Sequence, residues 1–325
     1  MLTVGPLLVA GVMALTSCGA SNGGSSGGGS SGSKTIGVSV PTVEGPFFTG
    51  MLYGIEQQAK KDGYKVTILS AGSYSNVDQQ VNQIQTLTAK KVDIMLVDPA
   101  DPTATQGPIQ QAVSQGMVTL GSGDPAPGAQ GSVSASHCTV GKDLATGAKQ
   151  LLPHGGTMGV LAGPAGAFWS TERLKCFKQD IAGTGIKIVA DKASNPDISD
   201  GLSIASDFLQ RYPSLDLVYG ADDTVGDGGA QAVQAAHRCG KTRVLSAVFG
   251  QQAQQLMKSG CLSYDVALQP VLIGRRAVEL GVAMKSGKKP GNTNLEIPNV
   301  AITPKNMSSV DIGDIRAPQG WKPSV

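Results

Sequence analysis

One short segment near the N-terminus has the residue types and spacing for covalent chemistry. Leu15-Thr16-Ser17-Cys18 closes an apolar, uncharged run that begins at Met1. It resembles a lipobox, the signal for attaching diacylglycerol to a cysteine and cleaving just before it. The run is about as long as the hydrophobic part of a signal peptide and too short to span a bilayer. The first charged residue is Lys34, although a signal peptide should begin with Lys or Arg. We expect export with a lipid on Cys18; the alternative is an uncleaved N-terminal tail.

The segment after Cys18 contains two formal matches to a catalytic motif. Residues 19–33 are rich in Gly and Ser, a composition that predicts a flexible tether. Gly-x-Ser-x-Gly, the pattern of a nucleophile elbow, occurs at 24–28 and again at 28–32. A nucleophile elbow needs a strand before the serine and a helix after it, and the tether offers neither. We therefore attach no hydrolase chemistry to these serines.

Two other patterns point weakly to phosphate or metal binding. Gly240-Lys241-Thr242 resembles the end of a P-loop, but position 235 is Ala and a helix is predicted just before it. His137, His154 and His237 fall on separate predicted elements without the spacing of metal ligands, and we expect surface or helix-end positions for them. Neither a catalytic set nor a metal site is predicted, so we expect a protein that is not an enzyme and has no cofactor.

The remaining cysteines suggest covalent cross-links. Cys138, Cys176, Cys239 and Cys261 form an even set, which in an exported protein permits two disulfides. Four cysteines allow three pairings, and buried free thiols are the alternative. No Cys-x-x-Cys spacing occurs, which argues against thioredoxin chemistry.

Composition narrows the classes further. A chain of 325 residues is long for one compact core, so two domains are expected. Only 15% of residues are charged and the net charge is +2, which provides no basic surface for nucleic acid. No apolar run of 18 or more residues follows Cys18, so no membrane-spanning helix is predicted there.

The elements that must position any site alternate between strands and amphipathic helices from Lys34 onward. The first series has predicted strands at 35–40, 65–69, 92–97 and 116–120, with helices over 48–59, 77–90 and 104–115. The second has predicted strands at 157–162, 186–190, 215–219, 243–248 and 262–268, with helices over 139–152, 168–183, 198–211, 224–238, 251–259 and 271–286. This α/β alternation predicts two doubly wound lobes built on parallel sheets. Their βα loops would surround one cleft at the carboxyl ends of the strands.

Several motifs in these loops resemble one known family. They are Gly45-Pro46-Phe47-Phe48, Asp98-Pro99-Ala100-Asp101, Gly163-Pro164-Ala165-Gly166 with Glu172-Arg173 and Phe177, Asp222-Asp223, and Gln269-Pro270 before Ile273-Gly274. In this order they resemble the ribose/galactose type of periplasmic sugar-binding proteins, the solute receptors of ABC transporters. The resemblance runs from about Lys34 to about Lys289.

The resemblance implies a three-crossing hinge between the lobes. The N-terminal lobe would comprise 34–135 and 269–303, the C-terminal lobe 136–268, and the tail 304–325. The crossings would fall near Ala135-Ser136, near Leu268-Gln269 and near Thr303. Binding of a ligand closes such lobes by a hinge motion.

The resemblance also implies eight ligand-binding positions, which are Phe47, Phe48, Asp98, Ser136, Trp169, Arg173, Asp222 and Gln269. Aromatic rings suit the apolar face of a sugar, and a carboxylate accepts two hydroxyl hydrogen bonds at once. Each residue also has a structural alternative: Phe48 and Trp169 in the core, Arg173 in an ion pair, and Asp98 as a strand end before proline. We expect Asp222 to face the ligand and Asp223 to cap the helix that follows.

The chain departs from the family pattern at three places. Gly121-Ser122-Gly123 stands where an Asp-Arg pair is usual, with Asp124 displaced, and Ser246-Ala247-Val248 stands where Gly-Phe-Asp is expected. Ser136-His137-Cys138 replaces a Ser-Asp-Asn. We therefore expect a pocket less polar than a ribose site.

Together these observations predict a monomeric, lipid-anchored solute-binding protein of an ABC importer, on the outer face of the cytoplasmic membrane or in the periplasm. Its ligand would be a sugar, polyol or similar small neutral molecule, and its partner a membrane permease. One alternative is a receptor of the same fold that signals to a kinase or chemoreceptor. Another is an exported α/β hydrolase, for which no nucleophile–base–acid set is visible.

Overall fold

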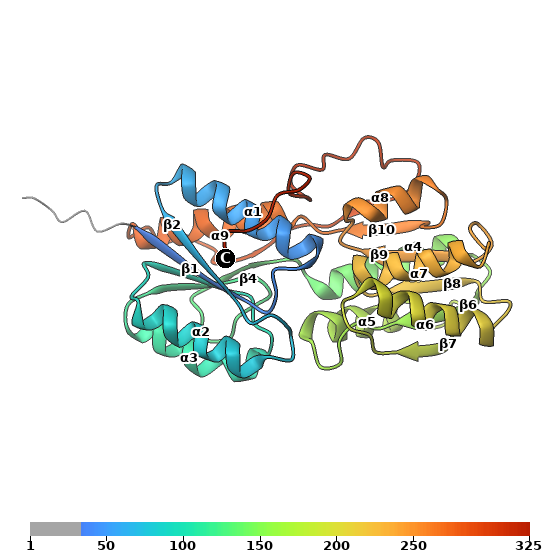
Figure 1. Ribbon diagram of the computed structural model, residues 1–325, viewed down its shortest axis with the longest axis horizontal. Coiled ribbons are helices and arrows are strands. Elements are labelled where there is room, and N and C mark those ends of the chain that lie inside the picture. Colours follow the sequence, from blue (N-terminus) through green and yellow to red (C-terminus); the bar gives the residue numbers. More distant parts are fainter. Residues whose placement is uncertain (1–33) are drawn as a thin grey trace, which may run out of the picture. The chain divides into compact units, whose positions relative to one another are not determined.

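The structure is a computed structural model that describes residues 34–325 (Figure 1). The proposed lipobox, the lipid on Cys18 and the Gly/Ser segment lie outside the described residues. Within 34–325, no helix is both long and apolar enough to cross a membrane.

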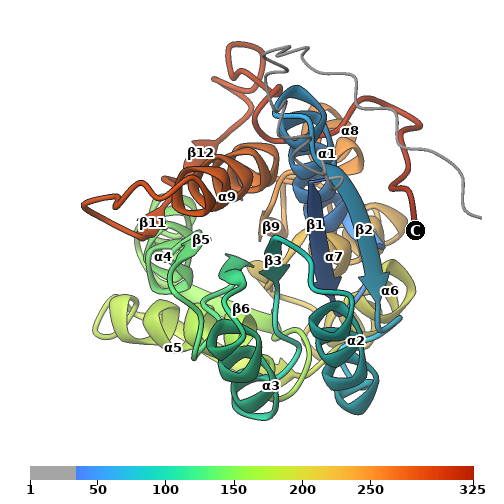
Figure 2. The same ribbon diagram turned by 90° about the vertical axis from the view of Figure 1, so that its left-hand side faces the viewer.

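The first of two six-stranded sheets is entirely parallel. Its strands are β1 (Thr35–Val40), β2 (Lys65–Ser70), β3 (Ile94–Val97), β4 (Val118–Gly123), β5 (Ser132–Ser134) and β11 (Asn294–Glu296), in the order β11-β5-β4-β3-β1-β2. Helices α1 (Gly45–Lys61) and α9 (Pro270–Lys285) cover one face, and α2 (Val77–Ala89) and α3 (Pro102–Ser114) cover the other (Figure 2). All four residues of β3 are buried, because helices cover both faces of this central strand and neither face is exposed to solvent.

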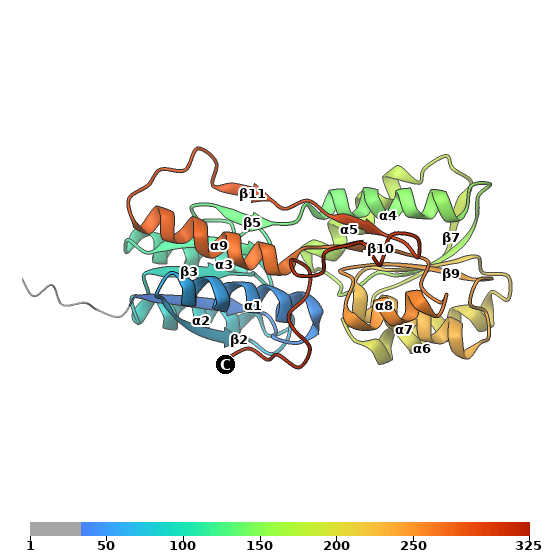
Figure 3. The ribbon, with the colours of Figure 1, turned by 90° about the horizontal axis from the view of Figure 1, so that it is seen from above.

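The second sheet repeats this architecture with one reversed edge strand. Its strands are β6 (Gly156–Leu161), β7 (Ile186–Lys192), β8 (Leu217–Gly220), β9 (Arg243–Ala247), β10 (Tyr264–Ala267) and β12 (Val300–Ile302), in the order β12-β10-β9-β8-β6-β7. Only β12 is antiparallel to its neighbour. Helices α4 (His137–Leu151) and α5 (Phe168–Asp180) lie on one face, and α6 (Ile198–Arg211), α7 (Asp223–Ala235) and α8 (Gln251–Lys258) on the other (Figure 3). The predicted fold class, two doubly wound α/β lobes, is confirmed.

Glycines allow α1 and α9 to pack backbone to backbone. A Cβ on Gly54 would lie 2.1 Å from the Val271 carbonyl oxygen, and one on Gly274 would lie 2.1 Å from that of Met51. Any larger residue at either position would push the two helices apart. This close packing fixes the N-terminal end of α1, which carries Phe47 and Phe48.

The chain passes between the two lobes three times. The first passage joins β5 to α4 and the second joins β10 to α9. The third lies at 297–299, because β11 pairs with β5 in the first sheet and β12 pairs with β10 in the second. The third crossing therefore precedes the predicted position near Thr303, and residues 300–302 belong to the second sheet, not to the N-terminal lobe.

The tail after β12 returns to contact both lobes. Ile315 is 1% exposed, and Asp314 forms an ion pair of 3.0 Å with Arg275 of α9. Trp321 packs edge to face on Tyr53 of α1, with ring centroids 5.3 Å apart. Arg316 reaches the second lobe, where it donates to Gln254 Oε1 at 3.0 Å. The tail is thus a further connection between the lobes.

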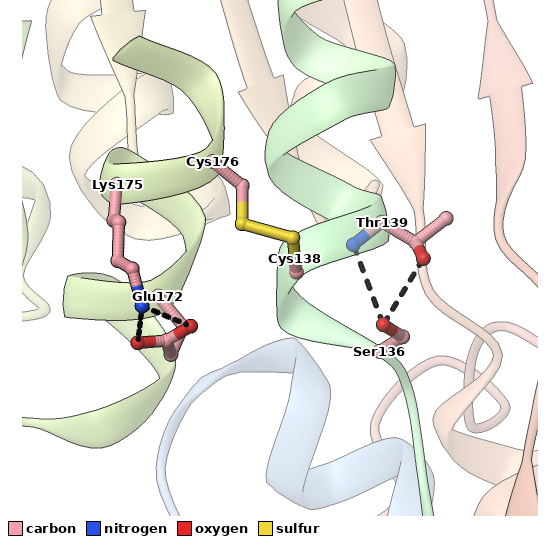
Figure 4. The surroundings of a disulfide bond; sticks show 6 residues. All are labelled: Ser136, Cys138, Thr139, Glu172, Lys175 and Cys176. Atoms are coloured by element: carbon pink, nitrogen blue, oxygen red, sulfur yellow. Dashed lines mark hydrogen bonds and ion pairs between the residues drawn. A yellow bond between two sulfur atoms is a disulfide. The ribbon is translucent and has the colours of Figure 1, made fainter. Parts of the chain in front are cut away.

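The four cysteines of the described chain form two disulfides, both inside the second lobe. Cys138 of α4 is bonded to Cys176 of α5, with Cα atoms 5.2 Å apart (Figure 4). Cys239 is bonded to Cys261, with Cα atoms 4.6 Å apart. Each bond ties together neighbouring elements of one lobe and leaves the hinge unlinked.

Candidate binding site

A cavity of about 880 Å³ lies between the two lobes. The first lobe lines it with the loops that follow β1, β2, β3 and β4, and the second lobe with the loops that follow β6, β7, β8 and β9. Every contributing loop stands at the carboxyl end of its strand. That is where parallel α/β sheets bind ligands, so the topology alone directs a site to this place.

The lobes touch each other beside the cavity. A Cβ on Gly250 of the second lobe would lie 2.8 Å from Pro46 Cγ of the first. The rings of Tyr74 and Trp169, from opposite lobes, have centroids 6.4 Å apart. The two lobes are therefore in contact at the edge of the cavity.

An aromatic wall runs across this contact. The Phe47 and Phe48 rings meet edge to face at 5.4 Å, and Phe48 lies 6.3 Å from Tyr74, measured between centroids. Trp169 is 6% exposed and its Nε1 has no hydrogen-bond partner within residues 34–325. The wall therefore offers apolar ring faces together with one buried, unused donor.

Asp98 lies on the first-lobe side of the cavity, and hydrogen bonds to its backbone groups hold it in place. Its N–H donates to Ser39 of β1 at 3.0 Å, and Gln80 of α2 donates to its carbonyl oxygen at 2.7 Å. A Cβ on Gly123, whose φ is 103°, would lie 2.6 Å from Asp98 Oδ2, so glycine leaves room for this carboxylate. Burial, together with the nearby charge of Asp124, raises the pKa of Asp98 well above its ordinary value. Its Oδ1 has no partner in the described chain.

Arg173 and His137 form the basic part of the site. Arg173 Nη1 donates to the Ala221 carbonyl oxygen at 2.8 Å, and its guanidinium carbon lies 4.8 Å from the Trp169 ring centroid. Arg173 Nε donates to His137 Nδ1 at 3.4 Å, while His137 Nε2 contacts Asp124 Oδ1. Because Nδ1 accepts, this network fits a neutral imidazole that donates from Nε2 to Asp124. Burial lowers the pKa of Arg173, but a guanidinium stays protonated.

Asp222, and not Asp223 as predicted, caps α7. Asp222 caps α7, since its Oδ1 accepts from Val225 N at 3.0 Å and from Thr224 Oγ1 at 2.9 Å. Asp223 is the first helical residue, and its Oδ2 has no partner in the described chain. Burial and the neighbouring carboxylates, Asp222 first, raise the pKa of Asp223 well above its ordinary value. Both residues line the cavity, and the cap uses Asp222 Oδ1 but not its Oδ2.

Two of the eight predicted ligand-binding residues do not line the cavity. Ser136 caps α4 by accepting from the Thr139 N–H at 3.4 Å and from its hydroxyl at 3.0 Å (Figure 4). Gln269 donates to the Pro298 carbonyl oxygen at 2.8 Å and so ties the second crossing to the third. Both predicted roles are therefore replaced by structural ones at the hinge. The cavity lining includes the other six, Phe47, Phe48, Asp98, Trp169, Arg173 and Asp222.

Several residues of the cavity lining were not predicted, among them Tyr74, Asp124 and His137. Tyr74 comes from the Ser- and Gly-rich loop after β2, a segment with no distinctive pattern. Asp124 enters the cavity because β4 continues through Gly121-Ser122-Gly123 to its end, three residues beyond the predicted strand. His137, expected at a surface or helix end, is the first residue of α4 but only 6% exposed. Asp124 and His137 add a carboxylate and an imidazole to the cavity lining.

The acidic side chains do not converge on a metal centre. Within residues 34–325, no group of three or more His, Cys, Asp or Glu side chains is arranged to hold a metal ion.

Comparisons with known proteins agree with this architecture. Residues 36–289 match the family described as periplasmic binding protein domain. The ribose import binding protein RbsB of Bacillus subtilis is 30% identical over 262 residues, which cover 80% of this chain and 84% of the relative. The D-allose-binding periplasmic protein of Escherichia coli is 29% identical, over 77% of this chain and 85% of the relative.

A solved structure shows the same fold at lower identity. It is an ABC transporter solute-binding protein from Bacillus halodurans with bound myo-inositol. The TM-score is 0.80 at 22% identity, and the match covers 86% of this chain and 98% of the other.

Proposed function

We propose that this chain, which belongs to the periplasmic binding protein family and within it to the ribose/galactose type of sugar-binding proteins, captures a sugar, polyol or similar small molecule between its two lobes. The chain is a solute-binding protein of the ABC-transporter type and not an enzyme. Its contribution to transport is to bind and to change between open and closed states.

One observation supports this ligand class above the others. Trp169 Nε1 and Asp98 Oδ1 are a buried donor and a buried acceptor from opposite lobes, each without a partner in residues 34–325. A buried polar group left unpaired costs about 1–3 kcal/mol. A hydroxyl both donates and accepts, so a polyhydroxylated ligand would satisfy both groups, while its C–H face packs on the aromatic wall. The ligand would thereby hold the lobes together.

The relatives support the same class. Their names state ribose import and D-allose binding, and both are covered over more than four fifths of their own length. The charged groups of this cavity are differently arranged from the pattern that the family resemblance implies, since Asp124 and His137 replace the missing Asp-Arg pair. We therefore propose the sugar or polyol class without assigning ribose or allose.

Export, anchoring and partner complete the proposal. We propose that the mature protein begins at Cys18 with a lipid, stays outside the cytoplasmic membrane, and delivers its ligand as a monomer to an ABC permease. The Leu15-Thr16-Ser17-Cys18 sequence supports the anchor, and the family supports the permease. Cys18→Ala should abolish incorporation of labelled fatty acid; unchanged labelling would contradict the anchor.

A thermal-shift screen of pentoses, hexoses and polyols tests the ligand class. A ligand at 100 times its Kd stabilises a protein by about 2.7 kcal/mol. At least one compound should raise the melting temperature, and Trp169→Ala should remove that rise. Phe168→Ala is the matched control, because Phe168 precedes Trp169 but is 39% exposed and outside the cavity lining. The absence of any stabilising compound would contradict the proposed class.

A further inference from the structure

Buried acidic side chains outnumber basic ones in the lining of the cavity. Four of its carboxylates belong to side chains at most 9% exposed, Asp98, Asp124, Asp222 and Asp223. Its basic side chains are Arg173 and His137, and the hydrogen-bond network fits a neutral histidine. Lysine is missing from the lining of this cavity. The chain as a whole has a net charge of +2, so the acidity is local to the cleft.

The single guanidinium does not neutralise these carboxylates. Arg173 donates hydrogen bonds to the Ala221 carbonyl oxygen and to His137, and its guanidinium packs on the face of Trp169. Asp222 Oδ1 accepts the hydrogen bond that caps α7, and Asp124 contacts His137. Within the described chain, Asp98 Oδ1 and Asp223 Oδ2 then have no hydrogen-bond partner, although their residues are only 2% and 3% exposed. Without a counter-charge, burial makes ionisation of these carboxyl groups costly and raises their pKa, and a cation beside them would favour their ionised form.

The aromatic wall favours a cation for an independent reason. Phe47, Phe48, Tyr74 and Trp169 line the same cavity and form a continuous series of contacts between ring centroids of 5.4, 6.3 and 6.4 Å. The faces of such rings carry partial negative charge and attract ammonium groups within about 6 Å. A neutral sugar would use these faces through its C–H groups but would leave the carboxylates uncompensated.

We propose that the ligand of this cavity carries a protonated amine in addition to its hydroxyl groups, as in an amino sugar, an aminocyclitol or an open-chain amino polyol. The ammonium group would lie among the carboxylates of the lining and against the aromatic wall, and the hydroxyls would use Trp169 Nε1 and Arg173. This inference rests on the proposed function, because it specifies the charge of the same hydroxylated ligand. Among the described residues no group of three or more His, Cys, Asp or Glu side chains could hold a metal ion, so an organic cation is proposed.

Matched pairs of compounds test the charge directly. The pairs are D-glucosamine and D-glucose, D-galactosamine and D-galactose, D-mannosamine and D-mannose, and glucamine and sorbitol. Binding of each to the full chain is measured by calorimetry at pH 7. In at least one pair the amine should bind about tenfold more tightly than its neutral partner, since close charge pairs across an interface contribute at least that much.

Two near-isosteric variants locate the effect. Asp98→Asn and Asp223→Asn each remove a charge while keeping the size of the side chain, and each should reduce the preference for the amine to about threefold or less. Asp78→Asn, an exposed change on α2 outside the cavity lining, should leave the preference unchanged. Because two variants carry the same expectation, failure of one to fold leaves the other as the test.

The possible outcomes separate this inference from the proposed function. Neutral members that bind as well as or better than their amines would overturn the cationic ligand and leave the sugar or polyol class standing. Binding of neither member of any pair, together with a negative thermal-shift screen, would overturn both. An amine preference that survives both Asp98→Asn and Asp223→Asn would also overturn the assigned position of the ammonium group.

Discussion

Tyr74 and Trp169, one from each lobe, meet across the cleft with ring centroids 6.4 Å apart. Neither residue lies in one of the three chain passages between the lobes. Their contact therefore depends on closure of the lobes. Trp169 also packs against the Arg173 guanidinium and lines the cavity, so it links contact between the lobes to the occupancy of the cavity.

Capping of α7 by Asp222 makes a prediction about stability. Asp222→Asn preserves an acceptor for the Val225 N–H and removes the buried charge, whereas Asp222→Ala removes both. We expect the alanine variant to be about 1 kcal/mol less stable than the asparagine variant, the usual contribution of an N-cap. Urea unfolding of the ligand-free variants measures the difference. Equal stability of the two variants would show that the cap contributes nothing here.

A buried acidic pair beneath the site predicts how stability depends on pH. Burial, then the charge of Asp265 and that of Asp222, raises the pKa of Asp227 to about 8. Burial raises the pKa of Asp265 to about 7, even though Ser246 donates to its Oδ2 at 2.5 Å and Arg173 lies nearby. In the unfolded chain both groups titrate near pH 4.

The sign of this dependence follows from proton binding. Between about pH 4 and pH 8 the folded state holds protons that the unfolded state has lost, so the stabilisation is complete below pH 4 and falls as pH rises through 7 to 8. We expect the ligand-free protein to be more stable at pH 5 than at pH 8.5, and Asp227→Asn to reduce this difference. Urea unfolding at both pH values measures it. If wild type and variant lost equal stability, the raised pKa of Asp227 would be refuted.

The tail predicts an effect on lobe closure. Arg316 donates to Gln254 Oε1 at 3.0 Å and to the Gly250 carbonyl oxygen at 3.4 Å, while its neighbour Ile315 is buried against the first lobe. Arg316→Ala should destabilise the closed state by about 1 kcal/mol and weaken ligand binding about fivefold. Calorimetry measures the affinity, and small-angle scattering measures the opening of the lobes.

Arg276→Ala is the control for this experiment. Arg276 lies on α9 and pairs only with Glu279 at 3.0 Å, three residues further along the same helix. Its removal should leave both affinity and scattering unchanged. If Arg316→Ala behaved in the same way, the tail would have no part in closure.

The disulfides predict a loss of stability without a loss of function. Loop-closure entropy gives about 3–4 kcal/mol for each bond, given sequence separations of 38 and 22 residues. Replacing Cys138 and Cys176 together by serine should lower the melting temperature, and the same holds for Cys239 and Cys261. None of the four residues lines the cavity, so the affinity should stay within about twofold. A large loss of affinity at unchanged stability would contradict this separation.

Most of the fold could be predicted because it rests on repeated local patterns. Apolar strands such as Ile94–Val97 and amphipathic helices such as Ile198–Arg211 reveal themselves in sequence. The three-residue strands β5, β11 and β12 do not, because they are too short for periodicity and exist only through pairing with a neighbour. The error in the third crossing follows from β11 and β12, which fix where the chain changes sheets.

The site was predictable where a side chain follows a recognisable strand, as Asp98 does. It was not predictable where the backbone decides between alternatives. Asp222 and Asp223 both suit an N-cap, and the extended backbone of Asp222, with φ −142°, assigns the cap to it. Asp124 was not predicted in the cavity because the strand was expected to end at residue 120, whereas Gly121-Ser122-Gly123 continue β4 and pair with β3 and β5.

The most direct test uses the fact that the chain has two tryptophans. In a Trp321→Phe variant, Trp169 is the sole tryptophan and reports from the cavity, while Trp321 in the tail packs on Tyr53 outside it. Titrating this variant with the sugars, polyols and amino sugars named above should change its fluorescence in a saturable manner for at least one compound. The reciprocal Trp169→Phe variant should show no such change. A silent Trp169 with every compound, or a response only from Trp321, would contradict binding in the cleft between the lobes.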